Sequence, residues 1–188
     1  MKMSYKIYTK QGDKGKTSII GQNNIDKHDH RIEAYGSIDE LNSYFGLLRS
    51  IEEIKKIDFL FNFLIKSQNI LFKVGSYLAQ TNEKRKEKQD FLISDSCILD
   101  LEKIIDEIES QIPSITRFVL PGGTIASSHF QISRTICRRC ERRITFLNKQ
   151  EELDENLLIY INRLSDFLFV SSRFVLFKSK QNELFWEK

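Results

Sequence analysis

Apolar residues recur every three or four positions through most of this chain, with polar residues between them. This spacing puts the apolar side chains on one face of a helix, and it predicts helices from about residue 31 onward. Five apolar stripes are found: Ile38, Leu41, Phe45 and Leu48; Ile57, Leu60, Leu64, Leu71, Val74 and Leu78; Ile98, Leu101, Ile105, Ile108 and Ile112; Phe130, Cys137, Cys140, Ile144 and Leu147; and Leu157, Ile161, Leu164, Leu168 and Val175. Near-heptad stripes of this kind are typical of antiparallel helices packed into a bundle. We therefore predict an all-α chain: one domain over residues 1–188, with a five-helix bundle over about residues 31–178.

Residues that favour helix ends give the expected boundaries of these helices. Ser37 has the spacing of a capping box, although residues 31–35 could form an earlier turn of the first helix. Ser94 is a candidate N-cap for the third helix. Gly123 or Thr124 could cap the fourth helix.

Three segments lack the helical period. We expect residues 1–30 to form a glycine-bearing loop, which could include a short strand at residues 5–8. Residues 82–90 are highly charged and predict an exposed loop, and residues 179–188 form a short aromatic tail. Only 2 prolines and 8 glycines occur in the chain, so long uninterrupted helices are easier to build than many short strands.

The second and fifth predicted helices carry a second set of apolar residues outside their main stripes. These residues are Phe61, Phe63, Ile65, Phe167, Phe169 and Phe174. The core of one bundle would not cover both edges of a helix, so the pattern predicts an oligomer.

Charge and cysteine content narrow the function classes. The net charge of +3 comes from 29 basic and 26 acidic residues that are interspersed, which argues against a dedicated nucleic-acid or membrane-surface protein. Three cysteines cannot all pair with one another, and a reducing cytoplasm is the expected compartment. No apolar run approaches the roughly 18 residues of a membrane-spanning helix.

The segment TKQGDKGKTS at residues 9–18 combines glycines with lysine and hydroxyl side chains. Such a segment can offer a polyphosphate many hydrogen-bond donors and positive charge. It is not a P-loop, because that pattern needs glycine at position 10, where the residue is Lys10, and a buried strand before it. A polar turn without a ligand is the alternative.

The fourth predicted helix carries a cluster of arginines. Arg134, Arg138 and Glu141 lie at i, i+4 and i+7, so they share a face and could present guanidinium groups to one anion. A solvated basic face is the alternative. Cys137 and Cys140 have a CxxC spacing, but a zinc site needs about four ligands and the chain has only three histidines, so buried thiols are expected.

Two further features, a pair of polar residues and an aromatic turn, are not required by a simple helical bundle. Asp39 and Asn162 lie beside strong apolar stripes, where polar groups require partners unless they are ordinary surface residues. The segment FVLPGG at residues 118–123 puts Phe118 on a rigid turn, which could plug the end of the bundle or offer an aromatic ring to a flat ligand.

Five blocks in this order resemble the PduO-type ATP:cob(I)alamin adenosyltransferases over nearly the whole chain. The blocks are TKQGDKGKTS, RIEAYGSIDELNS, FVLPGG, RTICRRCERR and YINRLSDFLF. The resemblance implies a homotrimer with active sites between neighbouring subunits. It implies transfer of the 5′-deoxyadenosyl group of ATP to cob(I)alamin, which gives adenosylcobalamin and triphosphate. A non-catalytic adenosylcobalamin carrier or an ATP-sensing helical protein is the alternative.

The resemblance also assigns the site residues. Those expected to bind ATP are Thr9, Lys10, Gly12, Asp13, Thr17, Ser18, Lys27, Arg138, Glu141, Arg142 and Asn162. Asp39 and Arg134 match an intersubunit salt bridge, and Phe118 matches the aromatic residue on the lower face of the corrin. Arg138, Arg134, Asp39 and Phe118 thus form the expected catalytic set.

Cofactors and partners follow from the same resemblance. Mg²⁺ is expected on the ATP phosphates, with no metal ligand from the protein, and cobalamin or a related corrinoid is expected as substrate. A flavoprotein-type reductase and an enzyme that uses adenosylcobalamin are the possible protein partners.

Overall fold

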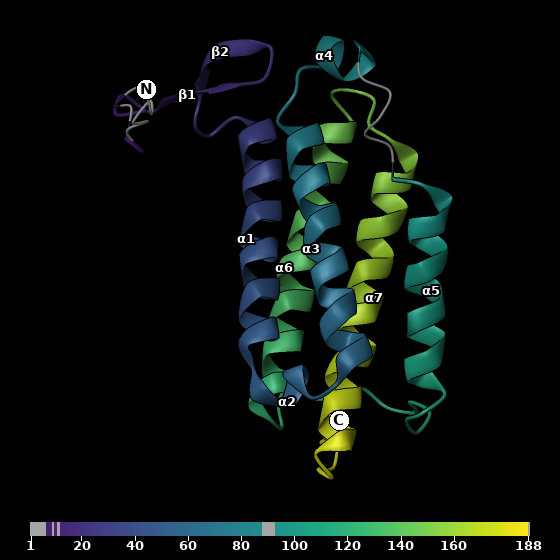
Figure 1. The fold of residues 1–188 in the computed structure, drawn as a ribbon. Helices are drawn as coiled ribbons and strands as arrows, with labels where there is room; N and C mark the ends of the chain where they lie inside the picture. Colours follow the sequence, from purple (N-terminus) through teal and green to yellow (C-terminus); the bar gives the residue numbers. More distant parts are fainter. Residues whose placement is uncertain (1–6, 9, 11, 88–92, 188) are drawn as a thin grey trace, which may run out of the picture.

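The computed structural model describes residues 7, 8, 10, 12–87 and 93–187 of the 188-residue chain (Figure 1). The elements within these residues are β1 Lys16–Ile19, β2 Gln22–Asp26, α1 His30–Ser50, α2 Glu52–Lys55, α3 Asp58–Leu78, α4 Asn82–Glu87, α5 Asp95–Glu109, α6 Ile125–Asn148 and α7 Glu155–Lys178. The predicted helical class is confirmed. The described chain has seven helices rather than five, because the short α2 and α4 add to the predicted long ones.

The long helices lie side by side (Figure 1). Helix α6 packs against both α1 and α7, α3 packs against α1, and α5 packs against α7. The core between them is apolar, with Leu41, Phe45, Leu64, Cys140 and Leu164 fully buried. Burial of these stripes is the main source of the free energy that stabilises the helices. None of the described helices is long and apolar enough to cross a membrane.

The second apolar edges of α3 and α7 meet each other inside the chain. The rings of Phe63 and Phe167 lie 4.8 Å apart, and those of Phe59 and Phe174 lie 5.6 Å apart, measured between centroids. Phe167 and Phe174 are fully buried. For Phe63, Phe167 and Phe174, the argument that a neighbouring subunit must cover the second edge is therefore wrong. Phe61, Ile65 and Phe169 are half-buried, and for them the oligomer stays a prediction.

The caps of α1 and α6 show which boundary predictions hold. Asp29 caps α1 by accepting a hydrogen bond of 2.8 Å from the backbone N–H of Arg31, so the helix begins before Ser37. The Ser37 hydroxyl is buried within α1 and donates to the carbonyl of Ala34, so the predicted capping box is wrong. Thr124 caps α6 by accepting from the backbone N–H of Ser127 at 3.1 Å, as predicted.

Ser94 occupies the N-cap position of α5 but makes no side-chain hydrogen bond to its backbone. Its hydroxyl lies 2.8 Å from that of Ser96 instead. The position was therefore predicted correctly, while the capping bond was not.

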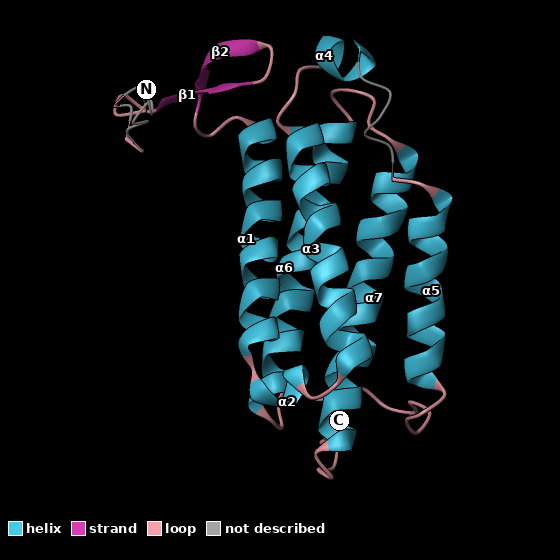
Figure 2. Cartoon of the chain, in the orientation of Figure 1, coloured by secondary structure: helices cyan, strands magenta, loops and turns pink. Residues whose placement is uncertain are grey.

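Two segments predicted as loops contain regular structure. β1 and β2 form an antiparallel hairpin, drawn in magenta in Figure 2, within the expected N-terminal loop. Of the segment 82–90, residues 82–87 form α4, whose Arg85 is buried, rather than an exposed loop, and residues 88–90 lie outside the described residues. Residues 7 and 8 are not in a strand, and residues 5 and 6 lie outside the described residues.

Candidate functional site

The hairpin and the turn before it enclose a polar cleft of about 720 Å³. The cleft is lined by Gly12, Lys16, Thr17, Ser18, Asn23, Asn24 and Lys27. Four of these residues were predicted to bind a triphosphate; Lys16 was not, nor were Asn23 and Asn24. Their side-chain amides add neutral hydrogen-bond donors to the two lysines, so the cleft suits an oxygen-rich anion.

The backbone conformation of the turn positions Lys16 and Lys27. Gly15 has φ +74°, a conformation that glycine adopts without strain, and its carbonyl accepts from the backbone N–H of Lys27 at 2.9 Å. A Cβ on Gly12 would lie 3.1 Å from Nζ of Lys27, so glycine there leaves room for the ammonium group. Lys16 lies 2.5 Å from Asp26 and lowers the pKa of that carboxyl group.

The remaining predicted loop residues do not line this cleft. Lys10 and Asp13 are exposed, and Lys10 has φ +59°. Thr9 lies outside the described residues. Their assignment to ATP stays a prediction.

A second pocket, of about 380 Å³, lies on α6. Its lining consists of Arg138, Glu141, Arg142, Thr145, Phe146 and Lys149. Asn162 of α7 donates a hydrogen bond of 2.9 Å to the Glu141 carboxylate, and Arg163 donates to the Asn162 carbonyl oxygen at 3.1 Å. The predicted nucleotide residues of α6 and α7 therefore lie together, and Glu141 is held in place from α7.

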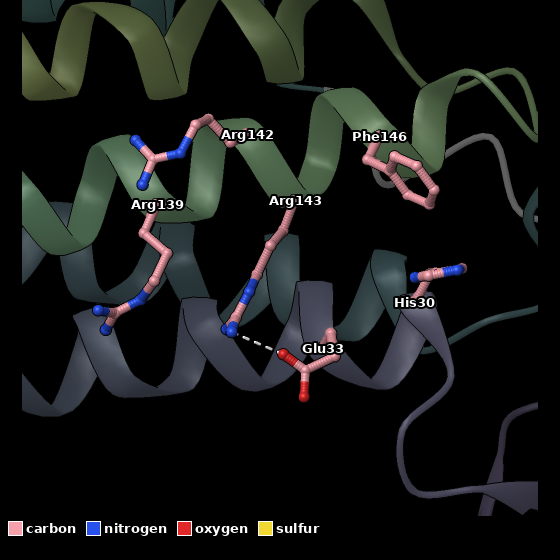
Figure 3. Close-up of a pocket in the computed structure, with 6 residues that line it drawn as sticks. All are labelled: His30, Glu33, Arg139, Arg142, Arg143 and Phe146. Carbon is pink, nitrogen blue, oxygen red and sulfur yellow. Dashed lines mark ion pairs between the residues drawn. The ribbon is translucent and has the colours of Figure 1, made fainter.

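An adjoining pocket of about 350 Å³ is lined by Arg139, Arg142 and Arg143 of α6 (Figure 3). The arginines of α6 are of two kinds. Arg143 lies 2.7 Å from Glu33 of α1, and Arg139 forms an ion pair with Glu40 of the same helix. These two arginines tie α6 to α1 and are neutralised there. Within the described part of the chain, Arg138 and Arg142 make no hydrogen bond or ion pair, so their guanidinium groups can receive an anion.

The wall of this pocket also contains two rings. His30, at the start of α1, packs edge-on against Phe146 of α6 with centroids 4.5 Å apart (Figure 3). Both rings line the same pocket as Arg142.

Arg134 is oriented by a side chain that the sequence did not single out. Its Nε donates to the Gln131 carbonyl oxygen at 2.8 Å, and the amide nitrogen of buried Gln131 donates to the Ser172 hydroxyl at 2.7 Å. Burial lowers the pKa of Arg134, and the charge of Arg138 lowers it further. Asp39 is exposed on α1 and makes no ion pair with Arg134 in this chain, so the intersubunit pair stays a prediction.

The Phe118 turn is held by the C-terminal tail. The backbone N–H of Leu120 donates to Leu184, and that of Trp186 donates to Phe118, both at 2.8 Å. The Phe118 side chain is 79% exposed and meets the Trp186 ring edge-on at 6.3 Å. It does not plug the bundle, and the turn instead presents the ring to the outside.

The two cysteines of α6 are packing residues. Cys137 donates to the carbonyl of Ile161 at 3.4 Å, and Cys140 donates to that of Ser37 at 3.0 Å. Burial raises the pKa of Cys140 to about 11 and that of Cys137 well above its usual range. The prediction of buried thiols is confirmed.

Comparison with known proteins identifies the family of this chain. The sequence model described as "Cobalamin adenosyltransferase" matches residues 7–175. The chain belongs to this family. A corrinoid adenosyltransferase of Bacillus subtilis (strain 168) is 39% identical over 97% of this chain and 93% of its own length. The Homo sapiens corrinoid adenosyltransferase is 38% identical over 97% of this chain and 74% of its own length.

Solved structures of the family agree with the fold. A phenylalanine-to-alanine variant of the PduO-type ATP:corrinoid adenosyltransferase from Lactobacillus reuteri, complexed with cobalamin and ATP, has a TM-score of 0.90 and 38% identity. The match covers 97% of this chain and 100% of that one. An arginine-to-lysine variant of the same enzyme, complexed with ATP, has a TM-score of 0.87 and 37% identity over 96% of this chain and 100% of that one.

In this family member, the predicted site residues form three groups rather than one. The hairpin cleft lies beyond the helix ends near the start of α1, and the tail that holds the Phe118 turn lies at the other end of the helices (Figure 1). The arginine pocket occupies the C-terminal half of α6, and the adjoining pocket reaches His30 at the start of α1, so both lie toward the hairpin end. Helix α1, with 21 residues, is about 30 Å long, which gives the scale of the separation.

Proposed function

We propose that the protein transfers the 5′-deoxyadenosyl group of ATP to cob(I)alamin, with adenosylcobalamin and triphosphate as products. The observation that carries this proposal is that the guanidinium groups of Arg138 and Arg142 line one pocket and make no ion pair with a described residue, in a chain that matches the cobalamin adenosyltransferase family over residues 7–175. Neighbouring Arg139 and Arg143 are neutralised by α1. Two free guanidinium groups are what a polyanionic leaving group needs.

The reaction is an alkyl transfer. The cobalt(I) electron pair forms a bond to the 5′ carbon of ATP, the bond from that carbon to oxygen breaks, and its electron pair leaves with the triphosphate. Cobalt is formally oxidised from +1 to +3. No proton needs to be removed in this step, so the protein needs no general base.

The protein contributes position and charge. Lys27 and the hydroxyls of Thr17 and Ser18 would hold one part of the triphosphate in the hairpin cleft, whose wall also contains Lys16 in its ion pair with Asp26. Arg138 and Arg142 would stabilise the negative charge that grows on the leaving group. A donor of this kind contributes about 3 kcal/mol to lowering a barrier.

Mg²⁺ fits this site only as a companion of ATP. The described residues that line the hairpin cleft include no carboxylate, so a hard cation there would take its oxygen ligands from the phosphates. When bound, the ion would neutralise phosphate charge. The side chains of the cleft would orient the phosphates themselves.

Phe118 would serve the corrinoid. Its exposed ring on a fixed turn can cover the lower face of a flat corrin and exclude an axial ligand, which eases reduction of cobalt(II) to cobalt(I). A flavoprotein-type reductase would supply the electron, and an adenosylcobalamin-dependent enzyme would receive the product. The three free thiols support a reducing cytoplasm as the location.

We further propose that the active form is a homotrimer with sites between neighbouring subunits. The separation of the hairpin cleft from the Phe118 turn supports this, because one chain cannot bring its own two parts to one reacting pair of ATP and corrinoid. Asp39 and Arg134, unpaired with each other in one chain, would then form a bridge between copies. Light scattering should give three times the chain mass, and a monomer with full activity would contradict it.

The reaction itself is tested with purified protein, ATP, Mg²⁺ and chemically reduced cob(I)alamin under anaerobic conditions. The expected products are adenosylcobalamin, seen by its absorption spectrum, and an equal amount of inorganic triphosphate. Tight binding of ATP and adenosylcobalamin without formation of the cobalt–carbon bond would instead indicate a carrier.

A further inference from the structure

The hairpin that carries the proposed phosphate cleft continues through residues 27–29 into α1, and the backbone of Ile20 ties it to the segment after α3. The backbone N–H of Ile20 donates to the carbonyl of Ala79 at 2.9 Å, and its carbonyl accepts from the N–H of Thr81 at 3.0 Å. Ile20 thereby forms a bridge with Gln80, in the segment that follows α3. Because Ile20 is only two residues from Ser18, the position of segment 79–81 determines where the hydroxyls of the cleft lie.

The next residue, Gly21, confirms how closely the hairpin approaches this segment. It has φ +98°, and a Cβ there would lie 2.7 Å from the Thr81 hydroxyl and 2.8 Å from Cγ of Lys84. A side chain on Gly21 would therefore push the hairpin away from the start of α4.

Three charged and largely buried side chains hold the segment 79–81 and the start of α4 in place. Arg31 of α1 donates through Nη1 to the carbonyl of Gln80 and through Nη2 to the carboxylate of Glu151, in the α6–α7 connection. Arg85 of α4 lies 2.6 Å from the same carboxylate oxygen. The side chains of Arg31, Arg85 and Glu151 are 15%, 4% and 10% exposed, respectively.

This cluster costs desolvation free energy and contributes little net stability to the fold. Nε and Nη1 of Arg85 and Oε1 of Glu151 are buried without a hydrogen-bond partner, and apolar residues of similar size would avoid that cost. What the cluster provides is geometry, because Glu151 fixes both ends of segment 80–85 at once: Gln80 through Arg31, and Arg85 directly. The Arg85 guanidinium also lies over the Tyr77 ring at 5.0 Å, which orients it.

We propose that Glu151 is a positioning residue for the phosphate-binding hairpin, acting through Arg31 and Arg85 on the segment to which Ile20 binds. It does not touch the nucleotide. It keeps Thr17, Ser18 and the cleft lysines in the arrangement that receives the triphosphate. The inference rests on the proposed function in so far as the ligand of the cleft is ATP.

The test compares Glu151→Gln with the wild type and with Asp100→Asn. The glutamine keeps the size of the side chain and removes its charge. The control removes one carboxylate charge from the exposed pair of Asp100 with Lys66, which are 2.5 Å apart on α5 and α3. Backbone amide exchange in the ligand-free protein is measured first. In Glu151→Gln, peptides covering residues 16–26 and 79–85 should exchange about tenfold faster, while those of α7 keep their rates.

Binding and turnover are measured next. Calorimetry with ATP and with inorganic triphosphate should show affinities about tenfold weaker for Glu151→Gln, by the same factor for both ligands, because only the phosphates contact the hairpin. The KM for ATP should rise in parallel, and kcat at saturating ATP should stay within about twofold of the wild type. Asp100→Asn should match the wild type in every measurement.

Arg31→Lys gives a second, milder variant if Glu151→Gln does not fold. It keeps the charge opposite Glu151 but cannot span Gln80 and the carboxylate with one planar group, so the same shifts are expected. Unchanged hairpin exchange in a folded variant would overturn the proposal, and so would faster exchange throughout the chain, or faster hairpin exchange with unchanged triphosphate affinity. Failure of the wild type to form adenosylcobalamin would reject the proposed function only, since exchange and triphosphate binding are measured without cobalamin.

Discussion

Replacement of Arg138 by alanine separates the chemistry of α6 from its packing. The side chain is exposed and makes no hydrogen bond or ion pair with any described residue, and alanine favours a helix. The free energy of unfolding should therefore change by less than about 0.5 kcal/mol. Loss of one donor to the leaving triphosphate should raise the barrier by about 3 kcal/mol, which lowers kcat roughly 10²-fold.

The assay uses chemically reduced cob(I)alamin and saturating ATP, with calorimetric unfolding measured in parallel. Arg143→Ala is the matched control, because the same residue type on the same helix pairs with Glu33 at 2.7 Å, where the side chains are 37% and 45% exposed. It should cost less than about 1 kcal/mol of stability and change kcat by less than about threefold. Equal losses of kcat in both variants, or none in Arg138→Ala, would refute the division of the α6 arginines into free and neutralised groups.

Three other predictions follow from particular side chains. Phe118→Ala should keep ATP affinity and stability, since the ring is 79% exposed, but should lose the four-coordinate cobalt(II) signal in anaerobic spectroscopy and the reaction that starts from cob(II)alamin; equal rates from cob(II)alamin would contradict its role. Gly123→Ala should cost at least about 1–2 kcal/mol and lower the thermal midpoint, because Gly123 has φ +97° and a Cβ would lie 2.4 Å from Leu176; an unchanged midpoint would count against this reading. At pH 8 a thiol with a pKa of about 11, such as that of Cys140, is ionised in about one molecule in a thousand. A thiol reagent should therefore label Cys140 and Cys137 only after unfolding, and Cys97 in the native state. Rapid native labelling of all three would be inconsistent with the buried pair.

Local patterns were sufficient where burial has a period. The apolar stripes predicted α3, α5 and α6 because each of these helices buries one face against neighbours and exposes the other. Helix α7 was also predicted by its stripe, although its residues 170–176 are all buried. The hairpin was missed because β2 is only five residues long and buries a single side chain, Ile25, so it shows no alternation. The contact of Ile20, between the two strands, with segment 79–81 joins distant parts of the chain, and a local pattern cannot show it.

Charged residues were harder to interpret than apolar ones. The sequence of α4 suggests solvent exposure, yet Arg85 is buried because its partner Glu151 comes from a distant part of the chain. The α6 arginines look equivalent along the helix. Only Glu33 and Glu40 on α1 distinguish the neutralised ones from those that remain free, and this requires knowing which helices are neighbours.

The distance between the hairpin cleft and the Phe118 turn has a genetic consequence. In the proposed assembly, a copy damaged only in its hairpin can still lend an intact Phe118 turn to a neighbour, and a copy lacking Phe118 can still lend its hairpin. Two alleles that are each inactive could therefore restore part of the activity when their products assemble together. A copy damaged in its α6 arginines would be complemented differently by a copy damaged in its hairpin and by a copy lacking Phe118. Mixing inactive variants in pairs would therefore map which parts of each site come from which copy.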